Sequence, residues 1–81
     1  MVYRDRTDYA RQVESFMHDF QTRTGGEIEV INPDTRDGIG FCQAYGIVEY
    51  PTIIVLDYNS IVQAMWRGLP LPTINEVSFY N

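Results

Sequence analysis

The side chains best suited to chemistry in this chain are one cysteine, one histidine and eleven carboxylates. Cys42 is the only thiol and His18 the only imidazole. A catalytic cysteine needs a base beside it, and no motif or spacing pairs these two residues. Free cysteine is among the most frequently buried residue types, so we expect Cys42 to be a silent thiol in the core or in a semi-buried position. A reactive Cys42, as in glutathione-dependent exchange, is the enzyme alternative.

The carboxylates form no recognisable catalytic or metal-binding pattern. Asp5 and Asp8 lie near an expected helix start, where capping explains both. Glu27 and Glu29 lie on one side of an expected strand and face solvent. No His, Cys, Asp and Glu cluster has the spacing of metal ligands, and the chain lacks a glycine-rich phosphate loop and a nucleophile elbow. We therefore expect no metal, no cofactor and, on balance, no enzymatic activity.

Size and charge set further limits. Eighty-one residues predict a single domain over residues 1–81. The net charge is −5, with no lysine and six scattered arginines, which speaks against nucleic-acid binding. No apolar run approaches the roughly 18 residues of a membrane span, and the first residues lack the apolar stretch of a secretion signal. A lone cysteine suits a reducing compartment, so we expect a cytoplasmic protein.

Periodicity predicts three helices, over about residues 7–24, 37–45 and 73–79. One apolar stripe defines the first: Tyr9, Val13, Phe16, Met17 and Phe20. Asp5 or Thr7 can cap that helix, and Asp8 suits the positive end of its dipole. Glycines end the first two helices. Thr73 and Glu76 have the spacing of a capping box for the third.

Four strands are predicted, over about residues 1–4, 27–31, 52–56 and 61–67. The element order is then β-α-β-α-β-β-α. The first two strands should be parallel with a right-handed crossover, and the last two an antiparallel hairpin. The continuous apolar run 53–56 is typical of a strand covered on both faces. The predicted fold class is α/β, a four-stranded mixed sheet with helices on both faces.

A proline directly before the third predicted strand is the most distinctive motif in the sequence. Pro51 follows an aromatic residue, Tyr50, which favours the cis isomer, and proline is tolerated at the first residue of a strand. The segments Tyr-Gly-Ile at residues 45–47, Tyr-Pro-Thr at 50–52 and Gly68 after the last strand complete the pattern. With the element order, these segments resemble the thioredoxin-like superfamily over nearly the whole chain. The closest members in size are the glutaredoxins.

The resemblance implies an active-site position at which the catalytic cysteine of the family is missing. Family members carry Cys-x-x-Cys, or at least one cysteine, where the first strand turns into the first helix, and residues 7–10 (Thr-Asp-Tyr-Ala) occupy that position here. A threonine hydroxyl cannot replace a thiolate that attacks disulfides. In the family, the backbone before the cis-proline pairs with an extended peptide or with glutathione. The resemblance therefore implies a peptide-binding site at Thr7, Asp8, Tyr9, Tyr50 and Pro51.

The predicted function is that of a redox-inactive, thioredoxin-like binding or scaffolding module for an extended peptide or a partner protein. Three alternatives remain open. Cys42 is a reactive thiol; the proline loop is present only because the fold needs it; or a homodimer covers a strand edge or the segment around Pro70 and Pro72. The sequence therefore predicts a monomer or a homodimer that binds neither nucleic acid nor membrane.

Overall fold

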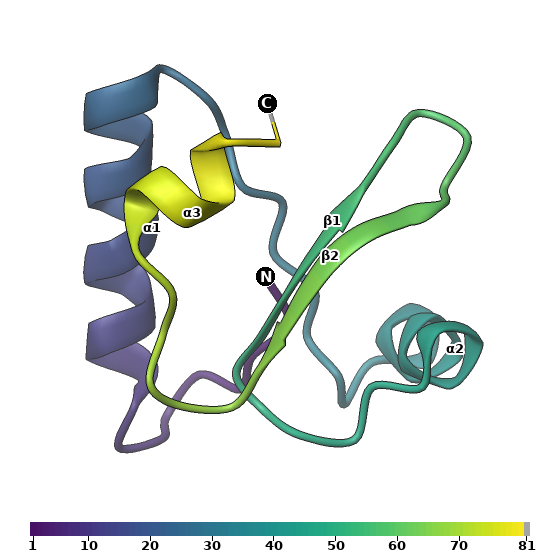
Figure 1. The fold of residues 1–81 in the computed structure, drawn as a ribbon. Coiled ribbons are helices and arrows are strands. Elements are labelled where there is room, and N and C mark those ends of the chain that lie inside the picture. The colour runs from purple at the N-terminus through teal and green to yellow at the C-terminus, as the bar shows by residue number, and fades with distance from the viewer. Residues whose placement is uncertain (81) are drawn as a thin grey trace.

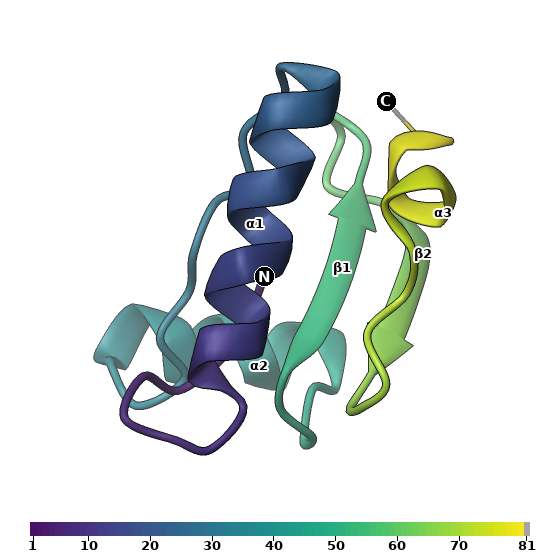
Figure 2. The ribbon, with the colours of Figure 1, turned by 90° about the vertical axis from the view of Figure 1, so that its left-hand side faces the viewer.

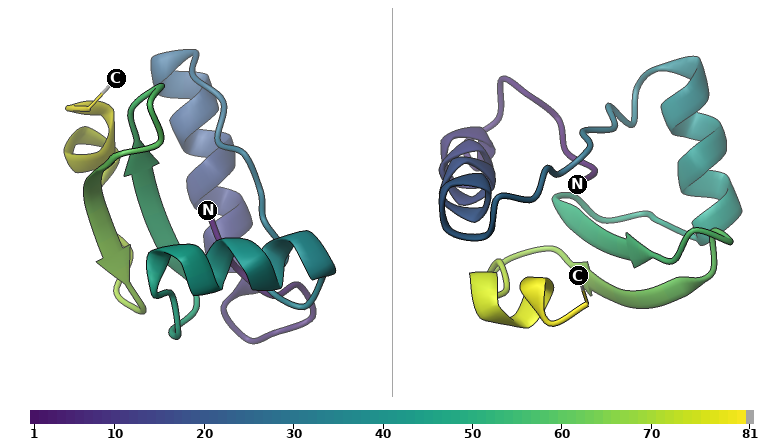
Figure 3. Two further views of the ribbon diagram at one scale, coloured as in Figure 1. Left: turned by 90° about the vertical axis from the view of Figure 1, so that its right-hand side faces the viewer. Right: turned by 90° about the horizontal axis from the view of Figure 1, so that it is seen from above.

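Three helices and one antiparallel hairpin make up the secondary structure of residues 1–80, which the computed structural model describes (Figure 1). The elements are α1 (Ala10–Thr24), α2 (Arg36–Tyr45), β1 (Thr52–Leu56), β2 (Val62–Arg67) and α3 (Ile74–Ser78). In the hairpin, Ile53 lies opposite Trp66, and the register shifts between Val55 and Leu56. Helices α1 and α3 contact each other, and Figure 2 shows β1 beside both of them. Helix α2 lies on the other side of the hairpin (Figure 3). The predicted third and fourth strands, their hairpin and the three helices are confirmed.

The predicted four-stranded mixed sheet with helices on both faces is wrong. The strands expected over residues 1–4 and 27–31 are reduced to single bridges, in which Val2 pairs with Ile31 in parallel and with Thr52 antiparallel. The pairing is short because the chain turns away after Tyr3 and forms an irregular loop from Arg4 onward. As a result, the sheet of the described residues has two strands, and most of β1 beyond Ile53 is only half-buried.

Two hydrophobic clusters form the core. The first lies between α1, α3 and β1 and contains Met1, Tyr3, Ala10, Val13, Phe20, Ile53 and Val77. The second lies against α2 and contains Val2, Cys42 and Ile47. Alternate residues of the first segment enter different clusters, because side chains of extended backbone point to opposite sides. The three residues Met1, Val2 and Tyr3 therefore join both halves of the core.

The helix ends follow the predicted pattern with one exception. Gly25 and Gly46 end α1 and α2 with φ values of 73° and 68°, as expected for left-handed caps, and the predicted capping box at Thr73 and Glu76 is present. The exception is the start of α1. It begins at Ala10 without a side-chain cap; the residue at the cap position is Tyr9, and the Thr7 hydroxyl donates to the Arg4 carbonyl at 2.8 Å. The predicted capping by Asp5 or Thr7 is therefore wrong.

The amino group of Met1 is buried, and its titration makes the free energy of unfolding depend on pH. It donates a hydrogen bond to the Glu29 carbonyl at 2.9 Å. Burial lowers the pKa of this amine from 8.0 to about 6, although the Glu29 carboxylate opposes the shift. Between pH 6 and 8 the unfolded chain holds a proton that the folded chain releases, so the free energy of unfolding rises with pH in this window.

We expect this amine to add about 2 kcal/mol of stability on going from pH 6 to pH 8. Urea unfolding at the two pH values measures the change. The control is the same chain with its amino group acetylated, which removes the titrating group and should lose this part of the pH dependence. Identical slopes for the two chains would contradict the assignment.

Candidate functional site

Arg4 brings together most of the residues that the sequence predicted as a binding site. Its guanidinium carbon lies 4.8 Å from the centroid of the Tyr50 ring, within the range of cation–π attraction. Its backbone N–H donates to the Tyr9 hydroxyl at 3.3 Å, and its carbonyl accepts from the Thr7 hydroxyl. The loop that contains Thr7 and Tyr9 is thereby held beside Tyr50. We refer to Arg4, Thr7, Tyr9, Asp34 and Tyr50 as the Arg4 corner.

Asp34 fixes the direction of the Arg4 side chain. Arg4 Nε donates to the two carboxylate oxygens of Asp34 at 3.1 and 3.2 Å, and this hydrogen bond is the main reason why the pKa of Arg4 is raised above its ordinary value. Both side chains are largely exposed, at 47% and 60%, so the pair orients the guanidinium more than it stabilises the fold. Asp8 is also exposed, and none of the hydrogen bonds among residues 1–80 uses its side chain.

The residues on both sides of Tyr50 are held by hydrogen bonds. The Pro51 carbonyl accepts from the Gly68 N–H at 2.8 Å, and the Glu49 carbonyl accepts from the Thr52 hydroxyl at 2.6 Å. Within residues 1–80, the N–H and C=O of Tyr50 make no hydrogen bond. The Tyr50–Pro51 peptide bond is cis, as is Leu69–Pro70. Tyr50 therefore offers one donor and one acceptor to an added chain.

An apolar pocket of about 370 Å³ has Tyr50 among its lining residues. It is lined by Pro33, Ile39, Cys42, Gln43, Gly46, Ile47, Val48 and Tyr50. Val48 is 78% exposed and Ile39 is 47% exposed, so two aliphatic side chains stand in water at one concave place. Exposed apolar groups around a concavity are typical of binding surfaces. We call the Tyr50 backbone together with this pocket the Tyr50 groove.

Cys42 is buried, with 6% of its surface exposed, as the sequence predicted. The pKa of Tyr50 is raised by burial of the phenol, then by the neighbouring Cys42 thiol, while Arg4 opposes the rise. His18 is exposed on α1 and does not line the pocket that contains Cys42. Among residues 1–80, no group of three or more His, Cys, Asp or Glu side chains could hold a metal ion.

Sequence reasoning missed Arg4, Asp34, Ile39 and Val48. The partners Arg4 and Asp34 are 30 positions apart, and no local pattern connects them. The sequence did contain a signal for Val48. An aliphatic residue in a short loop between a helix end and a strand is needed by neither element, so a binding role could have been considered for it. Ile39 had none, since half-buried aliphatic residues are ordinary on helices.

A comparison of the chain with protein-family models, with curated proteins and with solved structures found no match in any of the three. The resemblance to the thioredoxin-like superfamily therefore stays a prediction from the quoted segments. In the part of the chain that the structure describes, no helix has both the length and the apolar character needed to span a membrane.

Proposed function

We propose that this chain is a non-catalytic binding module that holds an extended peptide in the Tyr50 groove. The observation that carries the proposal is the unpaired N–H and C=O of Tyr50 beside an apolar pocket. Peptides that add to an exposed backbone edge gain affinity from main-chain hydrogen bonds and specificity from side-chain pockets. In this chain, the unpaired backbone groups and the apolar pocket lie within a few residues of each other.

The pocket favours an aliphatic side chain in the bound peptide. Its walls include Ile39, Ile47 and Val48, and a volume of about 370 Å³ leaves room for a leucine or valine. The neighbouring residues of the peptide would pass the Arg4 corner, where Arg4 is already paired with Asp34. The proposal therefore needs no cofactor and no charged group in the ligand. The single thiol, which cannot form a disulfide within the chain, supports a cytoplasmic location.

Thiol chemistry at Cys42 forms no part of the proposal. The thiol is buried and has no histidine beside it. Alkylation of native Cys42 by iodoacetamide at the rate seen in denaturant would contradict a purely binding role.

We expect an acetylated and amidated peptide, Thr-Val-Leu-Val-Thr, to shift the amide resonances of Tyr50 and Val48 in a nuclear magnetic resonance titration. Val48→Ser should weaken this binding roughly three- to tenfold, because it removes about 1 kcal/mol of apolar contact. Val62→Ser is the matched control, since Val62 is also exposed, at 41%, but lies on β2. If neither this peptide nor a broad set of extended peptides moves the Tyr50 resonance, the proposed function is wrong.

A further inference from the structure

At Val2, a gap one strand wide separates the start of β1 from Ile31, and we call this gap and its continuation the slot. Val2 fills its closed end. The N–H of Val2 donates to the Thr52 carbonyl at 2.8 Å, and the Thr52 N–H donates back at 2.9 Å. On the other side, Ile31 N–H donates to the Met1 carbonyl and Tyr3 N–H donates to the Ile31 carbonyl, at 2.9 and 3.3 Å. The two walls are therefore spaced so that one extended chain between them makes hydrogen bonds to both.

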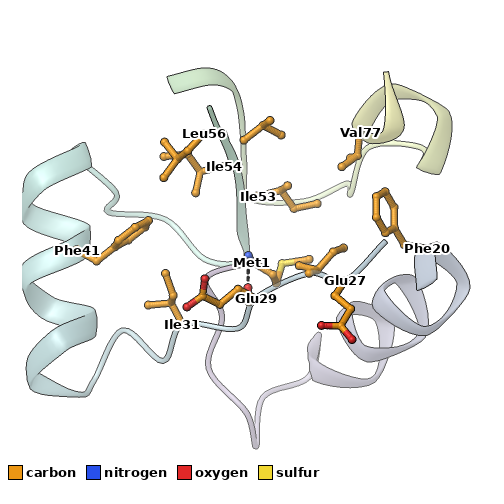
Figure 4. A pocket seen from close by; sticks show the side chains of 12 residues that line it. Met1, Phe20, Glu27, Glu29, Ile31, Phe41, Ile53, Ile54, Leu56 and Val77 are labelled. Atoms are coloured by element: carbon orange, nitrogen blue, oxygen red, sulfur yellow. Dashed lines mark hydrogen bonds between the residues drawn. The ribbon is translucent and has the colours of Figure 1, made fainter. Parts of the chain in front are cut away.

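Beyond Met1 the slot continues as a cavity of about 260 Å³ (Figure 4). Backbone groups of alternate strand residues point to the same edge. Since Thr52 faces Val2, Ile54 and Leu56 direct their N–H and C=O groups into the slot. In the described part of the chain, only Val2 pairs with this edge of β1. An unpaired apolar strand edge is a template for another chain, and folded proteins normally cover or interrupt it.

The side chains around the slot are apolar with an acidic rim. The apolar lining residues are Met1, Phe20, Ile28, Ile31, Phe41, Ile53, Ile54, Val55, Leu56 and Val77. Glu27 and Glu29 complete the lining; their carboxylates point to opposite sides of the slot, Glu27 toward the Phe20 side and Glu29 toward the Phe41 side (Figure 4). No arginine side chain lines the cavity.

We propose that this slot takes an extended segment of a partner protein, apolar in its centre and flanked by arginine or lysine, that runs antiparallel to β1 and continues the row begun by Val2. The spacing of the walls at Val2 fits a single strand, the alternation at Ile54 and Leu56 supplies its hydrogen bonds, and Glu27 and Glu29 select positive charge. The slot shares no lining residue with the Tyr50 groove, so this inference does not rest on the proposed function.

The test is a titration of the 15N-labelled chain with an acetylated and amidated peptide, Arg-Val-Thr-Val-Arg. The amides of Ile54, Leu56 and Glu29 should shift while that of Tyr50 stays in place. The double variant Glu27→Gln and Glu29→Gln should weaken binding roughly three- to tenfold. A matched control, Asp5→Asn and Asp19→Asn, makes the same charge change at exposed positions outside the slot and should leave the affinity unchanged.

Two further peptides make the outcome decisive. Proline in place of the central threonine removes a backbone donor and should reduce binding at least tenfold, and glutamate flanks should weaken binding by more than the neutral double variant does. Absence of shifts at Ile54 and Leu56, equal affinity for the proline or glutamate peptide, or shifts confined to Tyr50 would overturn the proposal. A dimer in light scattering whose Ile54 and Leu56 amides are protected without peptide would also overturn it, because a second copy would then be the occupant.

Discussion

Phe20→Ala should lower the free energy of unfolding by about 3–5 kcal/mol, enough to leave much of a chain of this size unfolded at 25 °C. Phe20 is 2% exposed and belongs to the cluster between α1, α3 and β1. Its ring centroid is 6.4 Å from that of Phe16, and it also lines the slot. Truncation to alanine removes this contact area and leaves a cavity that the surrounding helices can only partly close. Urea unfolding followed by far-ultraviolet circular dichroism measures the loss.

Phe79→Ala is the matched control for this prediction. Phe79 is 81% exposed and meets the ring of Tyr80 at a centroid distance of 5.2 Å, so its truncation should cost about 0.5 kcal/mol or less. Comparable losses for the two variants would mean that the first cluster does not hold the fold together as described.

Gly38→Ala and Gly40→Ala should have effects of opposite sign, although both replace a glycine inside α2. A Cβ on Gly38 would lie 1.8 Å from the Asn32 carbonyl oxygen and 2.9 Å from Thr35 Oγ1. Because the first of these atoms belongs to the backbone, α2 would have to move away from the turn that precedes it. We expect a loss of about 2–4 kcal/mol in the free energy of unfolding.

At Gly40 a Cβ meets nothing within 4 Å, so Gly40→Ala should raise the free energy of unfolding by about 0.5–1 kcal/mol through the lower entropy of the unfolded chain. Helix propensity alone predicts a gain at both positions. Thermal and urea unfolding of the two variants side by side therefore separate the packing argument from the propensity argument, and a gain at Gly38 would refute the close approach of α2 to Asn32.

Local signals were sufficient for the helices and the hairpin. Glycines in the left-handed conformation, the Thr73 capping box and the short loop between β1 and β2 all act over a few residues, and sequence reasoning can find them. The prediction of a strand over residues 27–31 was wrong, for a reason that is not local. Its alternation of Glu, Ile, Glu and Val fits a strand pattern, but a strand also needs a neighbour of similar length, and Val2 supplies one residue of pairing.

The arrangement of residues at the proposed site was predictable only in outline. Proline before an apolar strand drew attention to Tyr50, and the structure does place Thr7 and Tyr9 near it through Arg4. The position of Asp34 depends on how the loop before α1 and the turn before α2 meet in space, which no local pattern encodes. The pocket beside Tyr50 likewise depends on the packing of α2 against the loop that contains Val48.

The position of Met1 and Val2 between Thr52 and Ile31 has a practical consequence for handling the protein. Residues joined to the Met1 nitrogen, such as an affinity tag and its linker, are delivered directly toward Ile54 and Leu56. A tag with basic and aliphatic residues would act as a tethered competitor and raise the melting temperature of the fusion relative to the cleaved product. Tags for ligand screening therefore belong at the carboxyl end of the chain.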